Sequence, residues 1–120
     1  HLATNFREKN FLGIEVYLSG IGGVLRNAKK ENLTNIKIIN GDAEDFLTNK
    51  LKGIAFSSIL CLFPDPWPKK RHHKRRLIKE DFVHTLKTVT KLNGQLMFKS
   101  DWQDYFDSAK EVFLKSDSWE

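Results

Sequence analysis

Cysteine is almost absent from the sequence, because Cys61 is the single one among 120 residues. No intrachain disulfide can form, and a metal site built from several cysteines is excluded. Long hydrophobic runs are missing too. The longest stretch nearly free of charge, Ile54 to Phe63, has about half the length that a membrane-spanning helix needs. The N-terminus shows no charged start followed by an apolar segment, as a signal peptide would. We therefore expect a cytoplasmic protein that does not insert into a membrane.

The overall composition is that of a globular protein. Hydrophobic residues make up 40% and charged residues 29% of the chain, proportions that exclude a disordered or collagen-like chain. A length of 120 residues suits one small domain rather than two. The first residue is His1 and not methionine, so we expect the natural chain to begin upstream of it.

Positive charge is concentrated in one segment. The formal net charge is +5, and Lys69 to Arg76 contributes six Lys or Arg residues and no acid, so the rest of the chain carries a net charge of −1. A local cluster creates a directed electrostatic field, which scattered charges do not. The sequence thus predicts a near-neutral domain with one cationic arm.

Segments typical of strands alternate along the chain with segments typical of helices. The predicted strands cover residues 10–18, 36–39, 54–63 and 95–98, and the predicted helices cover 21–28 (with Ser19 as N-cap), 42–47, 77–89 and 102–113. The turn pair Asn93-Gly94 would lead into the last strand. This order predicts an α/β fold with a mostly parallel sheet and flanking helices.

An acid lies at or after the end of each predicted strand: Glu15, Asp42, Asp65 and Asp101. In open parallel sheets, ligands bind beyond the carboxyl ends of the strands. A carboxylate there can accept hydrogen bonds from both hydroxyls of a ribose or from an exocyclic amine. Four acids on one rim therefore predict a nucleoside pocket.

Local structure offers a second interpretation for two of these acids. Asp42 is also suited to cap the N-terminus of a helix. Ser100 and Gln103 fit a capping box, in which Asp101 would be an acid of the first turn. Glu15 is harder to explain in this way, because a carboxylate within an apolar strand costs several kcal/mol unless it meets solvent or a ligand.

The glycines Gly20, Gly22 and Gly23 superficially resemble a phosphate-binding loop. Leu25 stands where the dinucleotide-binding fingerprint requires glycine, and no Gly-Lys-Ser or Gly-Lys-Thr follows. We interpret the cluster as a turn and the start of a helix.

The segment from Phe63 to Arg76, FPDPWPKKRHHKRR, differs from ordinary loop sequence. Prolines on both sides of Asp65 restrict the backbone and remove hydrogen-bond donors, so we expect the acid to be held rigidly where the strand ends. Trp67 would present an exposed or half-exposed ring suited to stacking on a base, and the cations that follow would neutralise phosphates. Together these features indicate nucleic-acid recognition combined with chemistry. The alternatives for the basic run are a solvated loop or a localisation signal.

The sequence contains four strings that resemble those of the bacterial TrmB-type tRNA (guanine-N7)-methyltransferases, which use S-adenosylmethionine (SAM): NFLGIEV at 10–16, NGDAEDFL at 40–47, FPDPWPKKRHHKRR at 63–76 and SDWQDY at 100–105. The strings occur in the family's order across nearly the whole chain. The third is highly specific, and the others are weak alone. The resemblance implies a Rossmann-like SAM-dependent methyltransferase fold and direct in-line transfer of a methyl group from SAM to guanine N7 of tRNA.

The resemblance also implies roles for individual residues. Glu15 would bind the ribose of SAM, and Asp42 with the backbone of Ala43 would bind its adenine. Asp65 would lie at the methyl-transfer centre, near both SAM and guanine, as the catalytic residue. The substrate nucleotide would contact Lys69 and Asp101, and tRNA would contact Arg71, His72, His73, Lys74, Arg75 and Arg76. The composition of the loop itself adds Trp67 as a contact of the substrate nucleotide and Lys70 as a contact of tRNA. Adjacent histidines in a cationic run are poor metal ligands, so we expect no metal site.

Parts of the family's sequence are not found in this chain. The glycine-rich SAM loop would lie before residue 1, and the C-terminal strands would lie beyond Glu120. We therefore expect residues 1–120 to form a single partial methyltransferase domain that lacks its central strand. Such a piece alone would bind SAM weakly or not at all.

Two other functions stay open. Asp65-Pro66-Trp67 is similar to the Asp-Pro-Pro-aromatic loop of exocyclic-amine nucleic-acid methyltransferases, although it has one proline fewer. A non-catalytic basic RNA-binding module is the second alternative. The choice between a monomer and a homodimer also stays open.

Overall fold

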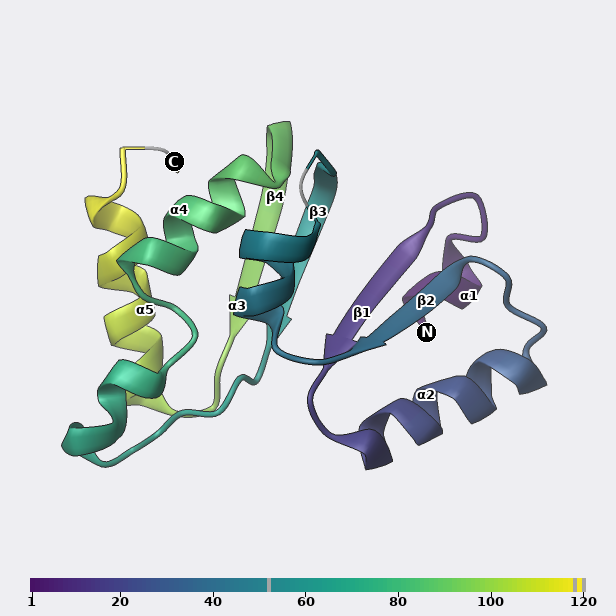
Figure 1. Ribbon diagram of the computed structural model, residues 1–120, viewed down its shortest axis with the longest axis horizontal. Helices are drawn as coiled ribbons and strands as arrows, with labels where there is room; N and C mark the ends of the chain where they lie inside the picture. The colour runs from purple at the N-terminus through teal and green to yellow at the C-terminus, as the bar shows by residue number, and fades with distance from the viewer. Residues whose placement is uncertain (52, 118, 120) are drawn as a thin grey trace. The chain divides into compact units, whose positions relative to one another are not determined.

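The computed structural model describes residues 1–51, 53–117 and 119 (Figure 1). The chain divides into two compact units, His1–Phe46 and Leu47–Glu120, which we call the N-terminal and the C-terminal unit. Among the described residues, no helix is both long and apolar enough to cross a membrane. The expectation of one partial domain over residues 1–120 concerns both units together and stays a prediction.

The N-terminal unit is a strand–helix–strand structure preceded by a short helix. Its elements are α1 (Leu2–Asn5), β1 (Phe11–Glu15), α2 (Leu18–Lys30), β2 (Ile36–Asn40) and α3 (Ala43–Asp45). The strands pair in parallel, in a register that runs from Phe11 beside Ile36 to Glu15 beside Asn40. Both predicted strands are confirmed, although β1 is shorter than the predicted 10–18.

Helix α2 begins earlier than the sequence predicts. Its N-cap is Tyr17, which makes no side-chain capping hydrogen bond, so the predicted cap Ser19 is wrong. The Tyr17 backbone N–H instead donates to the Glu15 carboxylate at 3.1 Å, and the chain enters the helix directly after this contact. The glycine cluster from Gly20 to Gly23 accordingly lies inside α2 near its start, and not in a turn before it.

Asn35 joins the N-terminal segment to the start of β2. Its buried side-chain amide donates to three backbone carbonyl oxygens, those of Ala3 at 3.1 Å, Phe6 at 3.2 Å and Lys9 at 2.9 Å. The backbone carbonyl of Asn35 accepts from the Phe11 backbone N–H at 2.8 Å, next to the first pair of the β1–β2 ladder. A buried amide with several acceptors stabilises one arrangement of the chain, because breaking these bonds leaves polar groups unsatisfied.

We expect Asn35→Asp to destabilise the protein by about 1–3 kcal/mol, because it removes the donating NH2 group and places carboxylate oxygens against carbonyl oxygens. The urea midpoint of denaturation measures this loss. Asn10→Asp is the matched control, since Asn10 is exposed and the same change there should leave the midpoint unaltered. An unchanged midpoint for Asn35→Asp would show that its hydrogen bonds add nothing to stability.

The C-terminal unit contains a second parallel pair of strands joined through a helix. After a π-helical turn, η1 (Phe46–Lys50), come β3 (Phe56–Leu62), the 3-10 helix η2 (Lys70–Arg75), α4 (Glu80–Thr88), β4 (Thr90–Lys99) and α5 (Gln103–Lys115). β3 and β4 pair in parallel, in a register that runs from Ser58 beside Gln95 to Leu62 beside Lys99. Figure 1 shows α4 and α5 together on one side of these strands.

Strand β4 has an irregular first part. It begins at Thr90, so the turn pair Asn93-Gly94 lies inside the strand, and its predicted place before the strand is wrong. The register shifts between Phe56, which pairs with Thr90, and Ser58. Asn93 has a φ of +63°, and a Cβ on Gly94 would lie 2.7 Å from the Lys91 carbonyl oxygen. The pair therefore forms a bulge, for which glycine is required at its second position.

Apolar residues of α4 and α5 form the core of the C-terminal unit. The largest fully buried side chains are Phe82, Val83, Leu86 and Tyr105. The Phe98 ring of β4 packs edge-on against Tyr105 at 5.3 Å. Burial also raises the pKa of the Cys61 thiol on β3 to about 11. Each large apolar side chain contributes about 1.5–3 kcal/mol of burial energy. The helices predicted over 77–89 and 102–113 are confirmed as α4 and α5, each with a later start.

Both units repeat one architecture. Each has two parallel strands joined by a connection that contains a helix, which confirms the predicted α/β class for each pair of strands.

Candidate functional site

Glu15 and Asp42 lie at the same edge of the β1–β2 sheet. Glu15 is the last residue of β1 and pairs in register with Asn40, the last residue of β2. The Gly41 backbone N–H donates to the Glu15 carbonyl at 3.1 Å, and the Asn40 side chain donates to the same carbonyl at 3.1 Å. The strand ends are therefore tied together, and the two acids lie where ligands of parallel sheets bind.

A groove of about 280 Å³ lies beside Glu15. One Glu15 oxygen accepts from the Tyr17 N–H, which orients the exposed carboxylate at the end of the strand. The groove lining is otherwise apolar: Gly13, Ile14, Gly20, Ile21, Val24 and Ile38. A single carboxylate beside an apolar surface suits a ligand that carries adjacent hydroxyl groups on a less polar body.

Asp42 caps helix α3, as one of its two interpretations predicts. Its Oδ1 accepts from the Glu44 backbone N–H at 2.9 Å. Ala43 is the first residue of α3, and N–H groups at this position have no partner within their helix. Asp42 and Ala43 together offer an acceptor beside a donor, the pattern that an adenine edge requires. A Cβ on Gly41 would collide with the Phe46 ring, so only glycine fits between the strand and this cap.

The loop that carries Asp65 leaves β3 in a strained conformation. Phe63 and Trp67 have φ angles of +50° and +44°, which cost non-glycine residues about 1–3 kcal/mol each. The Phe63 N–H donates to the Lys99 carbonyl of β4 at 2.9 Å and so extends the β3–β4 ladder. Asp65 lies between the two strained residues and is exposed. A backbone of this kind persists only when its surroundings hold it in place.

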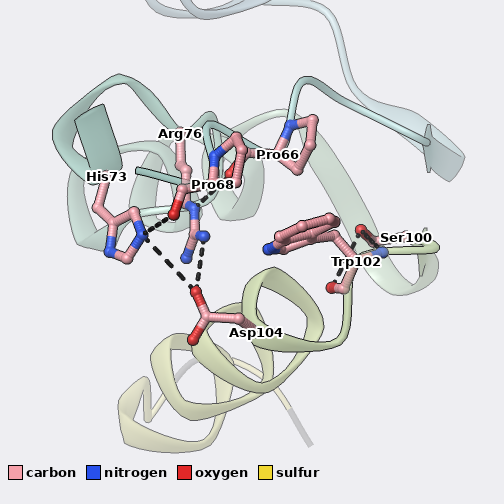
Figure 2. Close-up of polar contacts among 7 residues, drawn as sticks. All are labelled: Pro66, Pro68, His73, Arg76, Ser100, Trp102 and Asp104. Atoms are coloured by element: carbon pink, nitrogen blue, oxygen red, sulfur yellow. Dashed lines mark hydrogen bonds and ion pairs between the residues drawn. The ribbon is translucent and has the colours of Figure 1, made fainter. Parts of the chain in front are cut away.

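Arg76 holds the part of the loop that follows Asp65, whereas the Phe63 hydrogen bond holds the part before it (Figure 2 for Arg76). Arg76 is only 3% exposed. Its Nε donates to the Pro66 carbonyl at 2.7 Å, and its Nη2 donates to Asp104 Oδ2 at 2.8 Å. The guanidinium carbon lies 4.9 Å from the centre of the Tyr105 ring, and the Tyr105 hydroxyl accepts from the Ile78 N–H at 3.0 Å.

Arg76 differs in its surroundings from the other residues predicted to contact tRNA. Its guanidinium is turned into the C-terminal unit and bound by protein groups, and its contact with tRNA stays a prediction. Sequence reasoning missed the partners Asp104 and Tyr105. The pair Arg76–Asp104 is 28 residues apart, and no local pattern connects the two.

The other cations of the basic run lie on a compact helix. The predicted arm is in fact η2, with Lys69 as its N-cap. Its exposed members are Lys70, Arg71, Lys74 and Arg75. Exposed cations on one short helix form a surface that suits a polyanion.

Trp67 is half-buried, which confirms the predicted half-exposed ring. The Arg75 guanidinium carbon lies 5.1 Å from its ring centre, and His72 packs edge-on at 5.8 Å. His73 Nε2 lies 3.3 Å from the Pro68 carbonyl oxygen and 3.7 Å from Asp104 Oδ2. The loop and η2 therefore form one connected piece.

Within the described ranges, no three His, Cys, Asp or Glu side chains are grouped so as to hold a metal ion.

Asp101 follows β4 and is exposed, but the predicted capping box beside it is wrong. Helix α5 begins at Gln103 with Trp102 as N-cap and has no side-chain cap. Ser100 Oγ accepts from the Trp102 N–H at 3.2 Å, and the Gln103 side chain donates to Asp107 at 2.9 Å (Figure 2 for Ser100 and Trp102). The acid in the first turn of α5 is Asp104.

The structure brings the predicted site residues together in two groups. Asp65 and Asp101 follow neighbouring parallel strands of the C-terminal unit, as Glu15 and Asp42 do in the N-terminal unit. Lys69 and Trp67 lie in the same loop segment as Asp65. The prediction that all four acids share one rim concerns both units and stays a prediction.

Comparison with known proteins identifies the family. A family model described as "Putative methyltransferase" matches residues 1–120. The chain belongs to this methyltransferase family. Membership, together with the parallel strand pairs, confirms the predicted Rossmann-like α/β methyltransferase fold.

Curated relatives within this methyltransferase family carry a more specific name. The chain is 49% identical over 105 residues to the tRNA (guanine-N(7)-)-methyltransferase of Nitrosococcus oceani, an alignment that covers 88% of this chain and 44% of that protein. It is 47% identical over 104 residues to the protein of that name from Nitrosomonas eutropha, covering 87% and 46%. For Aeromonas hydrophila the identity is 34% over 119 residues, covering 99% and 50%. The chain spans about half the length of the curated relatives it matches.

The ion pair of Asp104 makes the stability of the methyltransferase chain depend on pH. The hydrogen bond from Arg76 lowers the pKa of the Asp104 carboxyl, against an opposing effect of burial, and the charges of Arg76 and His73 lower it further. A carboxyl whose pKa is lower in the folded protein stabilises the fold fully above its unfolded pKa, about 3.9. This stabilisation is lost as pH falls through the folded pKa.

We therefore expect the difference in urea midpoint between the protein and Asp104→Asn to be constant above about pH 5 and to shrink towards about pH 2. Asp107→Asn, an exposed acid of the same helix that does not contact Arg76, should show no such trend. A difference independent of pH would contradict the ion pair.

Proposed function

We propose that the protein containing this chain methylates guanine N7 in tRNA with SAM as the methyl donor. Three observations support this. The chain belongs to a methyltransferase family, its relatives are named tRNA (guanine-N(7)-)-methyltransferases, and an exposed acid is followed by a helix of exposed cations. The last of these carries the proposal, because it combines a carboxylate for the purine with a surface for phosphates. Cytoplasm, where tRNA is found, is the expected location.

The N-terminal unit supplies residues suited to SAM. The Glu15 carboxylate would accept from the ribose hydroxyls, and Asp42 with the Ala43 N–H would bind the adenine edge. These groups fit the donor chemically, since the described groove beside Glu15 is apolar apart from that carboxylate. SAM supplies an electrophilic methyl group on a sulfonium centre.

Asp65 would act on the developing charge of the purine. Guanine N7 carries a lone pair and needs no deprotonation before it accepts a methyl group. Positive charge then develops on the base, and a fixed carboxylate stabilises it in a site that is already organised. Lys69 would hold O6 of guanine or a phosphate, while Asp101 and the ring of Trp67 would contact the substrate nucleotide.

The surface of η2 would bind the tRNA backbone. Phosphate contacts give affinity that depends strongly on salt and set the register of the RNA. We assign these contacts to the four exposed cations, Lys70, Arg71, Lys74 and Arg75, with His72 and His73 beside them.

The direct test uses the protein at its full natural length. It is incubated with tRNA and SAM carrying a labelled methyl group, and the modified base is identified by nucleoside mass spectrometry and by chain cleavage specific for N7-methylguanosine. Label on an exocyclic amine would replace the proposal with the other methyltransferase activity. RNA affinity that does not respond to SAM, without any transfer, would indicate a non-catalytic RNA-binding module.

We expect Asp65→Asn to lower kcat for methyl transfer by at least about 100-fold, because the charge that stabilises the purine is removed. The dissociation constant for tRNA should stay within about two-fold, since phosphates contribute most of the affinity. Asp81→Asn, an exposed acid in the first turn of α4, is the matched control and should keep full activity. Equal losses of binding and transfer in Asp65→Asn would refute this division of roles.

We expect replacement of Lys70, Arg71 and Lys74 by Gln to reduce the dependence of tRNA affinity on salt. Each phosphate contact contributes about 0.7–0.9 to the slope of log affinity against log salt concentration, so three lost contacts should lower it by about two to three. The control carries Gln at Lys87, Lys91 and Lys110, which are exposed elsewhere on the C-terminal unit. A slope equal to that of the control would exclude η2 from the tRNA surface.

A further inference from the structure

We propose that Arg76 is a positioning residue: its buried guanidinium fixes the loop that carries Asp65 and thereby the orientation of the Asp65 carboxylate. The proposal rests on the proposed function for the role of Asp65. It adds a second task for the basic run, whose last member acts inside the protein while the others face the substrate.

The two residues of the ion pair between Arg76 and Asp104, which we call the anchor, differ in burial. The Arg76 side chain is 4% exposed, whereas the side chain of Asp104 is 63% exposed. A buried guanidinium must keep its partners, because an uncompensated charge away from water is costly. Its two donating nitrogens point to Pro66 and Asp104, and its central carbon lies over the Tyr105 ring. Figure 2 shows the guanidinium between the loop and the first turn of α5.

The anchored carbonyl is directly coupled to Asp65. The ring of Pro66 fixes its φ angle, so the Pro66 carbonyl carbon keeps a fixed place relative to the peptide group of Asp65. The same carbonyl belongs to the peptide group that enters Trp67, whose φ angle is +44°. A hydrogen bond to this one oxygen therefore restrains the residue before Pro66 and the residue after it.

Two backbone contacts of the loop lie on either side of Asp65. On one side the Phe63 N–H is bound to the Lys99 carbonyl, and on the other the Pro66 carbonyl is bound to Arg76. Both strained residues of the loop, Phe63 and Trp67, are adjacent to these contacts or form part of them. Loss of the contact between Arg76 and Pro66 would remove the restraint on the far side of Asp65 and let part of the backbone strain relax there.

Arginine is required here because its planar guanidinium donates in two directions while it stacks on a ring. A lysine could reach Pro66 or Asp104 with its single ammonium group, but it would lose the stacking on Tyr105. Arg75, the preceding residue, shows the contrast: it is exposed and its guanidinium lies over Trp67.

The first experiment reads the loop without reference to activity. The protein at its full natural length is labelled with 5-fluorotryptophan, and the Trp67 resonance is assigned by its loss in Trp67→Phe. Arg76→Lys and Asp104→Asn should both shift or broaden this resonance. Asp107→Asn, which removes an acid of the same helix away from Arg76, should leave it unchanged. An unshifted Trp67 resonance in folded Asp104→Asn and Arg76→Lys overturns the proposal.

The second experiment separates positioning from stability. Steady-state methyl transfer is measured well below the unfolding midpoint of each variant, with the folded fraction determined by circular dichroism. Asp104→Asn should lower kcat by about 10- to 100-fold, the scale expected for a displaced catalytic group, with the KM for tRNA within about two-fold. The kcat of the double variant Arg76→Lys/Asp104→Asn should be no lower than that of the less active single variant, since each change weakens the same anchor.

The outcomes distinguish the proposal from the proposed function. Losses that only follow the folded fraction, or that multiply in the double variant, overturn the positioning role. Should the wild-type protein transfer no methyl group to guanine N7, the proposed function fails, and the Trp67 resonance alone then decides whether Arg76 positions the loop. If Arg76→Lys does not fold, Asp104→Asn retains both readouts, because it keeps the buried arginine and removes only the carboxylate charge that holds the guanidinium in place.

Discussion

One buried guanidinium connects the loop after β3, the end of η2 and the start of α5. Arg76 binds the loop after β3 through Pro66 and the start of α5 through Asp104, and it follows directly after η2. Its charge is compensated by a carboxylate that is mostly in solvent, so the pair avoids the desolvation cost of a fully buried ion pair. The contact of Arg76 with Pro66 is one of the restraints on the strained backbone around Asp65, and it lies beyond Phe63, whose N–H makes the last described ladder hydrogen bond before the loop. Arg76 thus holds the loop that carries Asp65 and takes no part itself in the proposed methyl transfer.

In both units, one backbone hydrogen bond just beyond a strand end fixes where the chain leaves the sheet, shortly before an acid. In the N-terminal unit the Gly41 N–H extends the pairing to the Glu15 carbonyl, and in the C-terminal unit the Phe63 N–H does the same with Lys99. Each contact fixes where the chain leaves the sheet, so the residues that follow start from a defined point. Asp42 and Asp65 come one and two residues later, respectively. Parallel pairing alone therefore explains why acids after strands gather at one edge of each sheet.

The sequence predicts features that depend on neighbours along the chain and misses those that depend on distant contacts. The apolar stripe that contains Phe82 and Leu86 identifies its helix, and Asp42 caps a helix as its residue type suggests. Ser19 and Ser100 suit caps equally well, yet the chain enters α2 and α5 elsewhere, because the ends of β1 and β4 decide where each helix begins. The inward turn of Arg76 could not be predicted from a run of like cations. What distinguishes this arginine is its partner on α5, and that partner is set by tertiary packing.

In the basic run, the exposed cations lie on η2 and Arg76 is buried, so in the proposed reaction the surface for phosphates would be joined to the loop of Asp65. Four exposed cations lie on η2, and the loop of Asp65 is attached to that helix by the stacking of Arg75 on Trp67 and by the contact of His73 with Pro68. A polyanion that binds η2 therefore binds a surface rigidly linked to the carboxylate. Binding energy from phosphates remote from the base can then orient the base against Asp65, which is how enzymes convert affinity into rate. A flexible cationic arm of equal charge would give the same affinity without this orientation, so in the proposed reaction the short helix, and not the number of cations, would couple recognition to chemistry.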